Sequence, residues 1–400
     1  MGPTVSDGPV EGRAEGGVGA DTGKRVGWSE LFFDLVFVFA VTDISALIEH
    51  DHSWGGLLRA LVVFVPIYWM WVGTSIQTNL RDASQPALRL EIFAVALAAV
   101  FMALALPEAY SRLGLLYAIA YWAGRVVLGW SLLRMQRPVR TIPLNPHTVS
   151  MFVTGPLLVI GAVLHGDVRE VIWGVAALID LSSPTVLRSR LRAMHLDADH
   201  FAERFGLFVL IALGESVVAI GSSARDGRLT VSVGCAVAAA FALCCGLWWV
   251  YFHFAADAVR HSLATAKVQL DIIRLVFSYG HLSFIASIIV VAVGMRESVA
   301  HPGDDLGWGT TGLLFGGTAL YLATFGFTRW TMFRLVSVTR LTTAAVVLAL
   351  LPVAPYVPAL AAVTALALVV AVLNVVELLN VNQIGWQAKL TRREERRRST

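Results

Sequence analysis

Apolar runs of about 20 residues recur along this chain from Leu31 to Leu379, separated by short charged or Pro- and Gly-containing breaks. A run of that length, folded as a helix, crosses the roughly 30 Å hydrocarbon core of a bilayer. The composition agrees, because 56% of the residues are hydrophobic, 15% are charged and the mean hydropathy is +0.69. Soluble domains carry about 25% charged residues. The sequence therefore predicts an all-α, polytopic membrane helix bundle and excludes a water-soluble globular fold.

Dividing the chain at the breaks predicts about 12 transmembrane helices, since a helix satisfies its own backbone hydrogen bonds in lipid. The predicted spans are 31–48, 57–78, 88–106, 113–133, 148–165, 170–187, 204–221, 230–254, 271–294, 308–328, 338–353 and 357–380.

The two ends of the chain differ from these spans in composition. Residues 1–27 are rich in Gly and have no apolar run of signal-peptide type, so we expect a disordered cytosolic tail. Residues 386–400 form a basic tail, in which six Lys and Arg face two Glu from Lys389 onward. Anionic lipid headgroups attract such segments. We therefore expect the lipid bilayer and its headgroups as partners, and no nucleic acid.

Arg and Lys indicate the orientation, because short basic loops stay cytoplasmic. The alternating pattern predicts a multi-pass protein of the bacterial cytoplasmic (inner) membrane with both termini cytosolic. The predicted cytosolic set is Lys24, Arg25, Arg81, Arg89, Arg134, Arg137, Arg140, Arg188, Arg190, Arg192, Arg260, Lys267, Arg329, Arg334, Arg340 and the tail; the opposite set includes Glu49, Asp51, Glu108, Glu170, Glu297, Asp304 and Asp305.

Short matches in the same order link the two halves of the chain. They predict two parallel six-helix repeats, 28–195 and 196–385, related by an axis along the membrane normal. The matches pair Ser29–Ala40 with Ala202–Ala212, Tyr68–Val72 with Leu247–Tyr251, Leu90–Ile92 with Leu270–Ile272, and Trp130 and Arg134 with Trp330 and Arg334.

Ionisable residues inside the spans are the candidate functional groups, because each costs about 2.5–3.5 kcal/mol on insertion scales and so faces the protein interior or a wet cavity. We predict that Glu30, Asp34, Glu203 and Glu215 bind a substrate or ion. The accessory candidates are Asp43, His200, Arg204, His253, Asp257, Asp271 and His281.

Each of these candidates also has a structural interpretation. Glu30 stands where an acid favours a helix start, and Glu215 could form an ion pair. Metal binding has a weak signal, since His200 and Glu203 form one His-x-x-Glu where di-iron bundles use paired motifs. No GxxxxGK[ST], GxGxxG or GxSxG pattern occurs. Catalytic residues, metal and cofactor are therefore left unassigned.

The segment Trp28–Ala40, with its Glu-Leu-Phe-Phe-Asp-Leu run, resembles the bacterial low temperature requirement protein A family, as do His200–Leu207 and Ala212–Val217. The resemblance extends from Trp28 to about Asn380. It implies a multi-pass inner-membrane protein and carries over the acids Glu30, Asp34, Glu203 and Glu215. The family name refers to growth in the cold and assigns no reaction.

Three functions fit the sequence. The first is a proton- or cation-coupled transporter of a small solute, in which Asp34 and Glu215 bind the coupling ion and Glu30, Glu203 and Arg204 form a cytosolic-side gate. The second is an intramembrane enzyme acting on a lipid or isoprenoid, with Glu30, Asp34, His253, Asp257 and Asp271 holding a divalent metal and a pyrophosphate. The third is a regulatory membrane protein linked to cold or stress response.

Overall fold

The computed structural model describes residues 24–82, 85–135, 144–191, 195–226 and 228–398, and it describes the side chains of the last helix through Asn380. Within these ranges the chain is helical and contains no strand. In chain order the helices are α1 (Trp28–His50), α2 (Trp54–Leu80), α3 (Pro86–Ala105), η1 (Leu106–Glu108), α4 (Gly114–Met135), α5 (Pro146–Val149), η2 (Ser150–Thr154), α6 (Gly155–Val163), α7 (Asp167–Val186), α8 (Arg188–Leu191), α9 (Ala198–Asp226), α10 (Val231–Phe252), α11 (Ala256–Thr265), α12 (Gln269–Ile272), η3 (Ile273–Gly280), α13 (His281–Ala300), α14 (Gly307–Thr311), η4 (Gly312–Gly316), α15 (Gly317–Phe333), α16 (Val338–Leu350), η5 (Ala354–Tyr356) and α17 (Ala359–Arg398).

Consecutive helices that continue one another are treated as one rod: α5 with η2 and α6, α12 with η3 and α13, and α14 with η4 and α15. Each apolar segment predicted from the sequence lies largely on one such rod. Among the described residues, 9 rods are long and apolar enough to cross a membrane. The fold is therefore a polytopic membrane helix bundle. Three other rods fall short by this measure: α7, which carries several charges, α14 through α15, and α16, whose 13 residues span only about 20 Å. The count of twelve spans remains a prediction.

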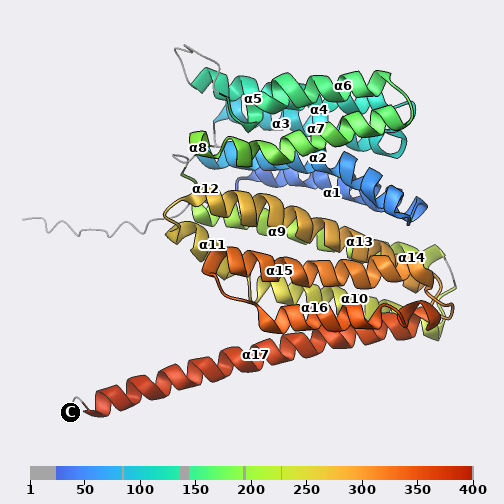
Figure 1. Ribbon diagram of the computed structural model, residues 1–400, viewed down its shortest axis with the longest axis vertical. Coiled ribbons are helices and arrows are strands. Elements are labelled where there is room, and N and C mark those ends of the chain that lie inside the picture. The colour runs from blue at the N-terminus through green and yellow to red at the C-terminus, as the bar shows by residue number, and fades with distance from the viewer. Residues whose placement is uncertain (1–23, 83–84, 136–143, 192–194, 227, 399–400) are drawn as a thin grey trace, which may run out of the picture.

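The rods lie side by side in one elongated stack (Figure 1). Helices of the first half of the chain form one end of the stack and helices of the second half form the other, with the long red α17 outermost. Helices α1 and α2 meet α9 and α13 in the middle, where contacts join the two halves. Side chains on these four helices are therefore placed to meet across the halves.

The helix contacts of the first half recur in the second. In the first half α1 contacts α2 and α3, α3 contacts α4, α4 contacts α6, α6 contacts α7, and α7 contacts α2. In the second half α9 contacts α10 and α13, α13 contacts α15, α15 contacts α16, α16 contacts α17, and α17 contacts α10. This order of contacts is compatible with a duplication, and the two parallel repeats remain a prediction.

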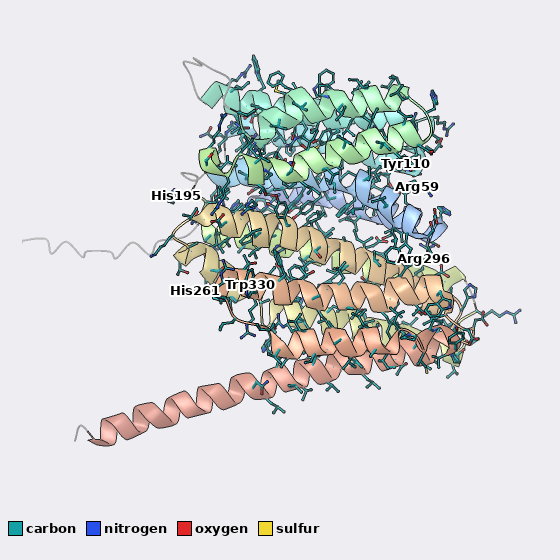
Figure 2. The ribbon with its side chains drawn as sticks, in the orientation of Figure 1. Arg59, Tyr110, His195, His261, Arg296 and Trp330 are labelled. Atoms are coloured by element: carbon teal, nitrogen blue, oxygen red, sulfur yellow. The ribbon has the colours of Figure 1, made fainter. Side chains whose placement is uncertain are left out.

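The two ends of the rods carry different polar groups. Figure 2 labels Arg59, Tyr110 and Arg296 at one end and His195 and His261 at the opposite end. Helix α1 begins and helix α2 ends at this second end, so Lys24 and Arg25, which precede α1, and Arg81, which follows α2, lie there. Which end faces the cytosol remains a prediction.

The end near Arg59 is tied together by charged groups. Arg59 pairs with Asp51 at 2.6 Å and with Glu170 at 3.7 Å, so it links the α1–α2 loop to α7. Hydrogen bonds from Ser53 hold the pKa of Asp51 below its ordinary value. The loop carboxylate is therefore ionised and fixed in place at neutral pH.

The predicted tails fall largely outside the described part of the chain. Residues 1–23 are not described, while Lys24 donates from Nζ to the backbone carbonyls of Thr78, Asn79 and Arg81 at the end of α2. A cation at that position satisfies the open carbonyls of a helix C-terminus. The backbone of the predicted basic tail continues α17, but its side chains are not described. Arg137, Arg140 and Arg192 also lie outside the described residues.

Candidate functional site

Glu30 and Asp34 lie one turn apart at the start of α1. Gly27 is the N-cap of this helix, and its N–H donates to Glu30 Oε2 at 2.8 Å. Glu30 therefore fills the helix-start role that its position favours. Both carboxylates are nonetheless buried, with 1% and 3% of the residue exposed, so each also requires partners from other helices.

Arg204, from α9, supplies the partner for Asp34. Its Nη2 lies 2.9 Å from Asp34 Oδ1, and its Nη1 lies 3.9 Å from Glu30 Oε1. Trp71, from α2, donates from Nε1 to the same Asp34 oxygen at 2.8 Å, and the guanidinium lies 5.5 Å from the Trp71 ring centroid. The charge of Asp34 is therefore compensated inside the protein by a cation from the other half of the chain.

His200, one turn before Arg204, binds the second acid. Its Nε2 forms a 3.2 Å hydrogen bond with Glu30 Oε2, while its Nδ1 lies 3.1 Å from Asn79 Nδ2. Asn79 is fixed by a reciprocal pair of 2.8 Å hydrogen bonds to the backbone of Asp197. Because the Asn79 amide donates to Nδ1, the neutral imidazole carries its proton on Nε2 and donates it to Glu30.

We call Glu30, Asp34, His200 and Arg204 the ion-pair cluster. All four are buried, yet Asp34 Oδ2 and Arg204 Nε have no hydrogen-bond partner among the described residues. Buried polar atoms are normally paired. The cluster thus retains hydrogen-bonding capacity that this arrangement does not use.

A layer of aromatic rings closes the space beyond the ion-pair cluster. Phe208 of α9 lies at its centre, stacked on Trp71 at 4.4 Å and on Tyr68 at 6.0 Å between ring centroids. Phe37 of α1 meets Phe208 edge-on at 5.9 Å. All four rings are fully buried. The layer separates the ion-pair cluster from the rest of the α1–α9 interface.

Two more acids, Asp43 of α1 and Glu215 of α9, meet on the far side of the aromatic layer. Asp43 lies roughly 14 Å beyond Asp34 along α1 at 1.5 Å per residue. Thr42, the chain neighbour of Asp43, contacts Glu215, so the two acids lie at the same part of the α1–α9 interface. Thr42 donates to Glu215 Oε2 at 2.5 Å, and the buried Asp43 Oδ2 has no partner among the described residues.

Neither member of this acid pair has an ion-pair partner in the described part of the chain. Arg296, whose charge reaches Glu215, is held at 3.0 Å by Glu49. The acid pair therefore differs from the ion-pair cluster, in which Arg204 compensates the acids.

The other predicted residues lie apart from both groups. Glu203 is exposed and lines an open hollow with Lys24 and Arg260. His253 and Asp257 are exposed, and Asp271 pairs with Arg188 at 2.6 Å. His281 is buried, where its Nε2 lies 2.7 Å from the Tyr251 hydroxyl. These residues do not converge with Glu30 and Asp34, and within the described ranges no three His, Cys, Asp or Glu side chains form a group that could hold a metal ion.

Comparison with known proteins identifies the family. The model of the bacterial low temperature requirement A protein (LtrA) family matches residues 25–375, which is most of the chain. The chain belongs to the LtrA family. It is similar to an uncharacterized protein of Rhizobium meliloti (strain 1021), with 31% identity over 310 residues that cover 75% of this chain and 76% of that protein. No solved structure matches.

The residues matched to LtrA include the ion-pair cluster and the acid pair of Asp43 and Glu215. They also include a third set of buried polar residues, which the sequence did not single out. Asp180 of α7 accepts hydrogen bonds from the hydroxyls of Ser150 at 2.7 Å, Thr154 at 3.0 Å and Tyr121. Arg125 of α4 donates to Ser150 at 2.5 Å. Both charged residues lie inside predicted spans, so the rule that singled out Asp34 also applies to them.

Proposed function

We propose that this LtrA protein is a proton- or cation-coupled transporter of a small solute. The observation that supports this proposal is the pair of Asp43, which is half-buried, and Glu215, which is buried; neither has a compensating ion pair among the described residues. Two carboxylates in that setting are unfavourable unless they take up a proton or a cation. Reversible binding of one positive charge is the chemistry that a coupled transporter requires.

The aromatic layer and the ion-pair cluster form the closure on one side of this acid pair. Phe37, Tyr68, Trp71 and Phe208 pack against each other and block the interface. The Asp34–Arg204 pair then joins α1 to α9 beyond the layer. We propose that Asp34, Glu30 and Arg204 act as a gate, and that Asp43 and Glu215 bind the coupling ion.

The arrangement of the chain supports the same proposal. Transporters built from repeats place their sites where the repeats meet. The acid pair lies between α1 and α9, which open the two proposed repeats, 28–195 and 196–385, and the helix contacts recur between those halves. We further propose an inner-membrane location with the ion-pair cluster toward the cytosol, both termini cytosolic and the tail at anionic headgroups.

The enzyme and regulatory functions remain alternatives. The enzyme would need acids that converge on a metal, and Asp257 and Asp271 lie apart from Asp34 in the structure. A regulator would use the same acids as structural links only. The geometry favours transport because the acid pair has no compensating ion pair. Its two members also come from different halves of the chain, Asp43 from α1 and Glu215 from α9.

The experiment compares the metabolites of cells and medium, with and without the protein. A coupled transporter changes the distribution of one compound between cell and medium without changing its total, and an uncoupler abolishes the difference. Glu215→Gln removes the effect while the protein stays in the membrane, whereas Asp199→Asn, an exposed acid on the same helix, retains it. A compound that is chemically converted would establish the enzyme, and an unchanged metabolite pool would favour the regulator.

A further inference from the structure

A separate cavity lies on the other side of α2 from the ion-pair cluster. Its volume is about 170 Å³, and five stretches of chain line it: α2, α4, the start of α5, α7 with α8, and α12 with η3. Most of its wall is apolar, including Val72, Ile76 and Leu132. A space of that size holds roughly ten water-sized groups. It therefore fits a ligand of about that many non-hydrogen atoms.

The polar part of the wall is basic. Arg125, His147 and Arg274 line the cavity beside the neutral Asn145 and Ser278, and no acidic side chain does so among the described residues. Arg274 also pairs with Asp271 at 3.4 Å, outside the lining. Arg125 and His147 are 1% and 8% exposed. Both lie against Gly73, where an added Cβ would come within 2.8 Å of Arg125 Nη1 and 3.1 Å of His147 Cε1. The absence of a side chain at Gly73 lets the two groups approach one place on α2.

These basic groups keep free hydrogen-bonding atoms. Arg125 donates from Nη1 to the Trp69 carbonyl at 3.2 Å and from Nη2 to Ser150, but its buried Nε has no partner among the described residues. The same holds for the buried Nδ1 of His147 and Nε of Arg274. Buried nitrogen atoms of this kind normally find an acceptor. These atoms are closed off from the cavity in this arrangement, so an anionic oxygen reaches them only when the side chains turn toward it.

The local backbone favours a site at this position. One wall is a π-helical turn, η3, a geometry found frequently at functional sites. Ile273, Arg274 and Ser278 of η3 line the cavity, and Ser150 of η2 holds Arg125. Helix α2 also presents Trp71 and Ser75 to the ion-pair cluster. The cavity and the cluster thus share one helix.

We propose that this cavity binds an amphiphilic anion, with its anionic oxygens on Arg125 and His147 and a short apolar chain along Val72, Ile76 and Leu132. The proposal is independent of the transport function, because a substrate, an effector or a bound lipid would use the same chemistry. A free carboxylate and an anionic lipid headgroup are two sources of that chemistry.

The test measures binding of radiolabelled octanoate to the full chain in phosphatidylcholine nanodiscs, with empty nanodiscs as the blank. We expect saturable binding, and binding of octanol that is about ten- to a hundredfold weaker, because the charge-assisted hydrogen bonds are lost. If the natural occupant is a lipid headgroup, nanodiscs that contain phosphatidylglycerol will weaken octanoate binding to the wild type. The same octanoate affinity in both lipids assigns the site to a free anion.

Two variants locate the site without touching the Arg125 and Asp180 network. Ile76→Trp fills the cavity and should abolish octanoate binding, whereas Leu61→Trp, on an exposed apolar position of the same helix, should not. His147→Leu should weaken binding about tenfold with an unchanged melting temperature. The proposal is overturned if binding is not saturable, if octanol binds as well as octanoate, or if folded Ile76→Trp binds like the wild type.

Discussion

The Asp34 carboxylate and the Arg204 guanidinium lie 2.9 Å apart, and both are buried where α1 packs against α9. In the sequence the two residues are 170 positions apart. The pair joins the two halves of the chain. It also gives Asp34 a compensating charge, which distinguishes it from Glu215.

Removing one partner of this pair should destabilise the protein. Breaking a buried ion pair leaves an uncompensated charge and costs about 3–5 kcal/mol. Asp34→Asn should therefore lower the melting temperature in detergent strongly. The double variant Asp34→Leu with Arg204→Met removes both charges and should recover much of the loss.

If Asp34→Asn is instead as stable as the wild type but inactive, Asp34 takes part directly in binding, as the sequence analysis predicts. Monodispersity in detergent, measured alongside melting, distinguishes a stable inactive variant from a misfolded one.

Phe208 should be necessary for the closure. Its ring lies between Trp71, Tyr68 and Phe37, so Phe208→Ala leaves a cavity at the centre of the aromatic layer. Such a truncation costs about 3–5 kcal/mol. We expect liposomes containing this variant to dissipate a pH gradient faster than those containing the wild type, with Phe208→Leu between the two. An equal leak in all three would remove the layer from the gate.

The topology prediction concerns the two ends of the rods. Reporter fusions at Thr400 and in the loop that contains Asp304 and Asp305 should report opposite sides of the membrane, with Thr400 cytosolic, because the basic residues gather at one end. Reporters on the same side would contradict the twelve-span arrangement.

The basic tail should be dispensable for transport. Each basic residue near an anionic surface contributes only about 1 kcal/mol. Truncation after Gln387 should leave the melting temperature and solute distribution unchanged. A loss of transport in a truncated protein that is still inserted would assign the tail a direct role.

Much of the architecture could be predicted because apolar run length determines where membrane helices form. The charges inside the spans likewise led to Asp34 and Glu215. Pairing could not be predicted, since the contact of Asp34 with Arg204 depends on how α1 packs against α9. Glu203 precedes Arg204 directly, yet it is exposed while Arg204 is buried. Adjacent residues on a helix face directions about 100° apart, and sequence alone did not show which one faced inward.

The cavity beside Arg125 could be found only from the structure. Its walls come from five segments, and the orphaned nitrogen atoms of Arg125 and His147 appear once α4 and α5 pack against Gly73. The presence of Arg125 and Asp180 within spans was a signal of burial, but it carried no information about their shared network.

The most direct test of the account follows the compound found in the cell comparison, in proteoliposomes with an imposed pH gradient. The account predicts that Glu215→Gln retains exchange of the compound between the two sides and loses its accumulation against a gradient, while wild type and Asp199→Asn accumulate it equally. Accumulation by Glu215→Gln at the wild-type level would contradict the assignment of the coupling ion to the pair of Asp43 and Glu215.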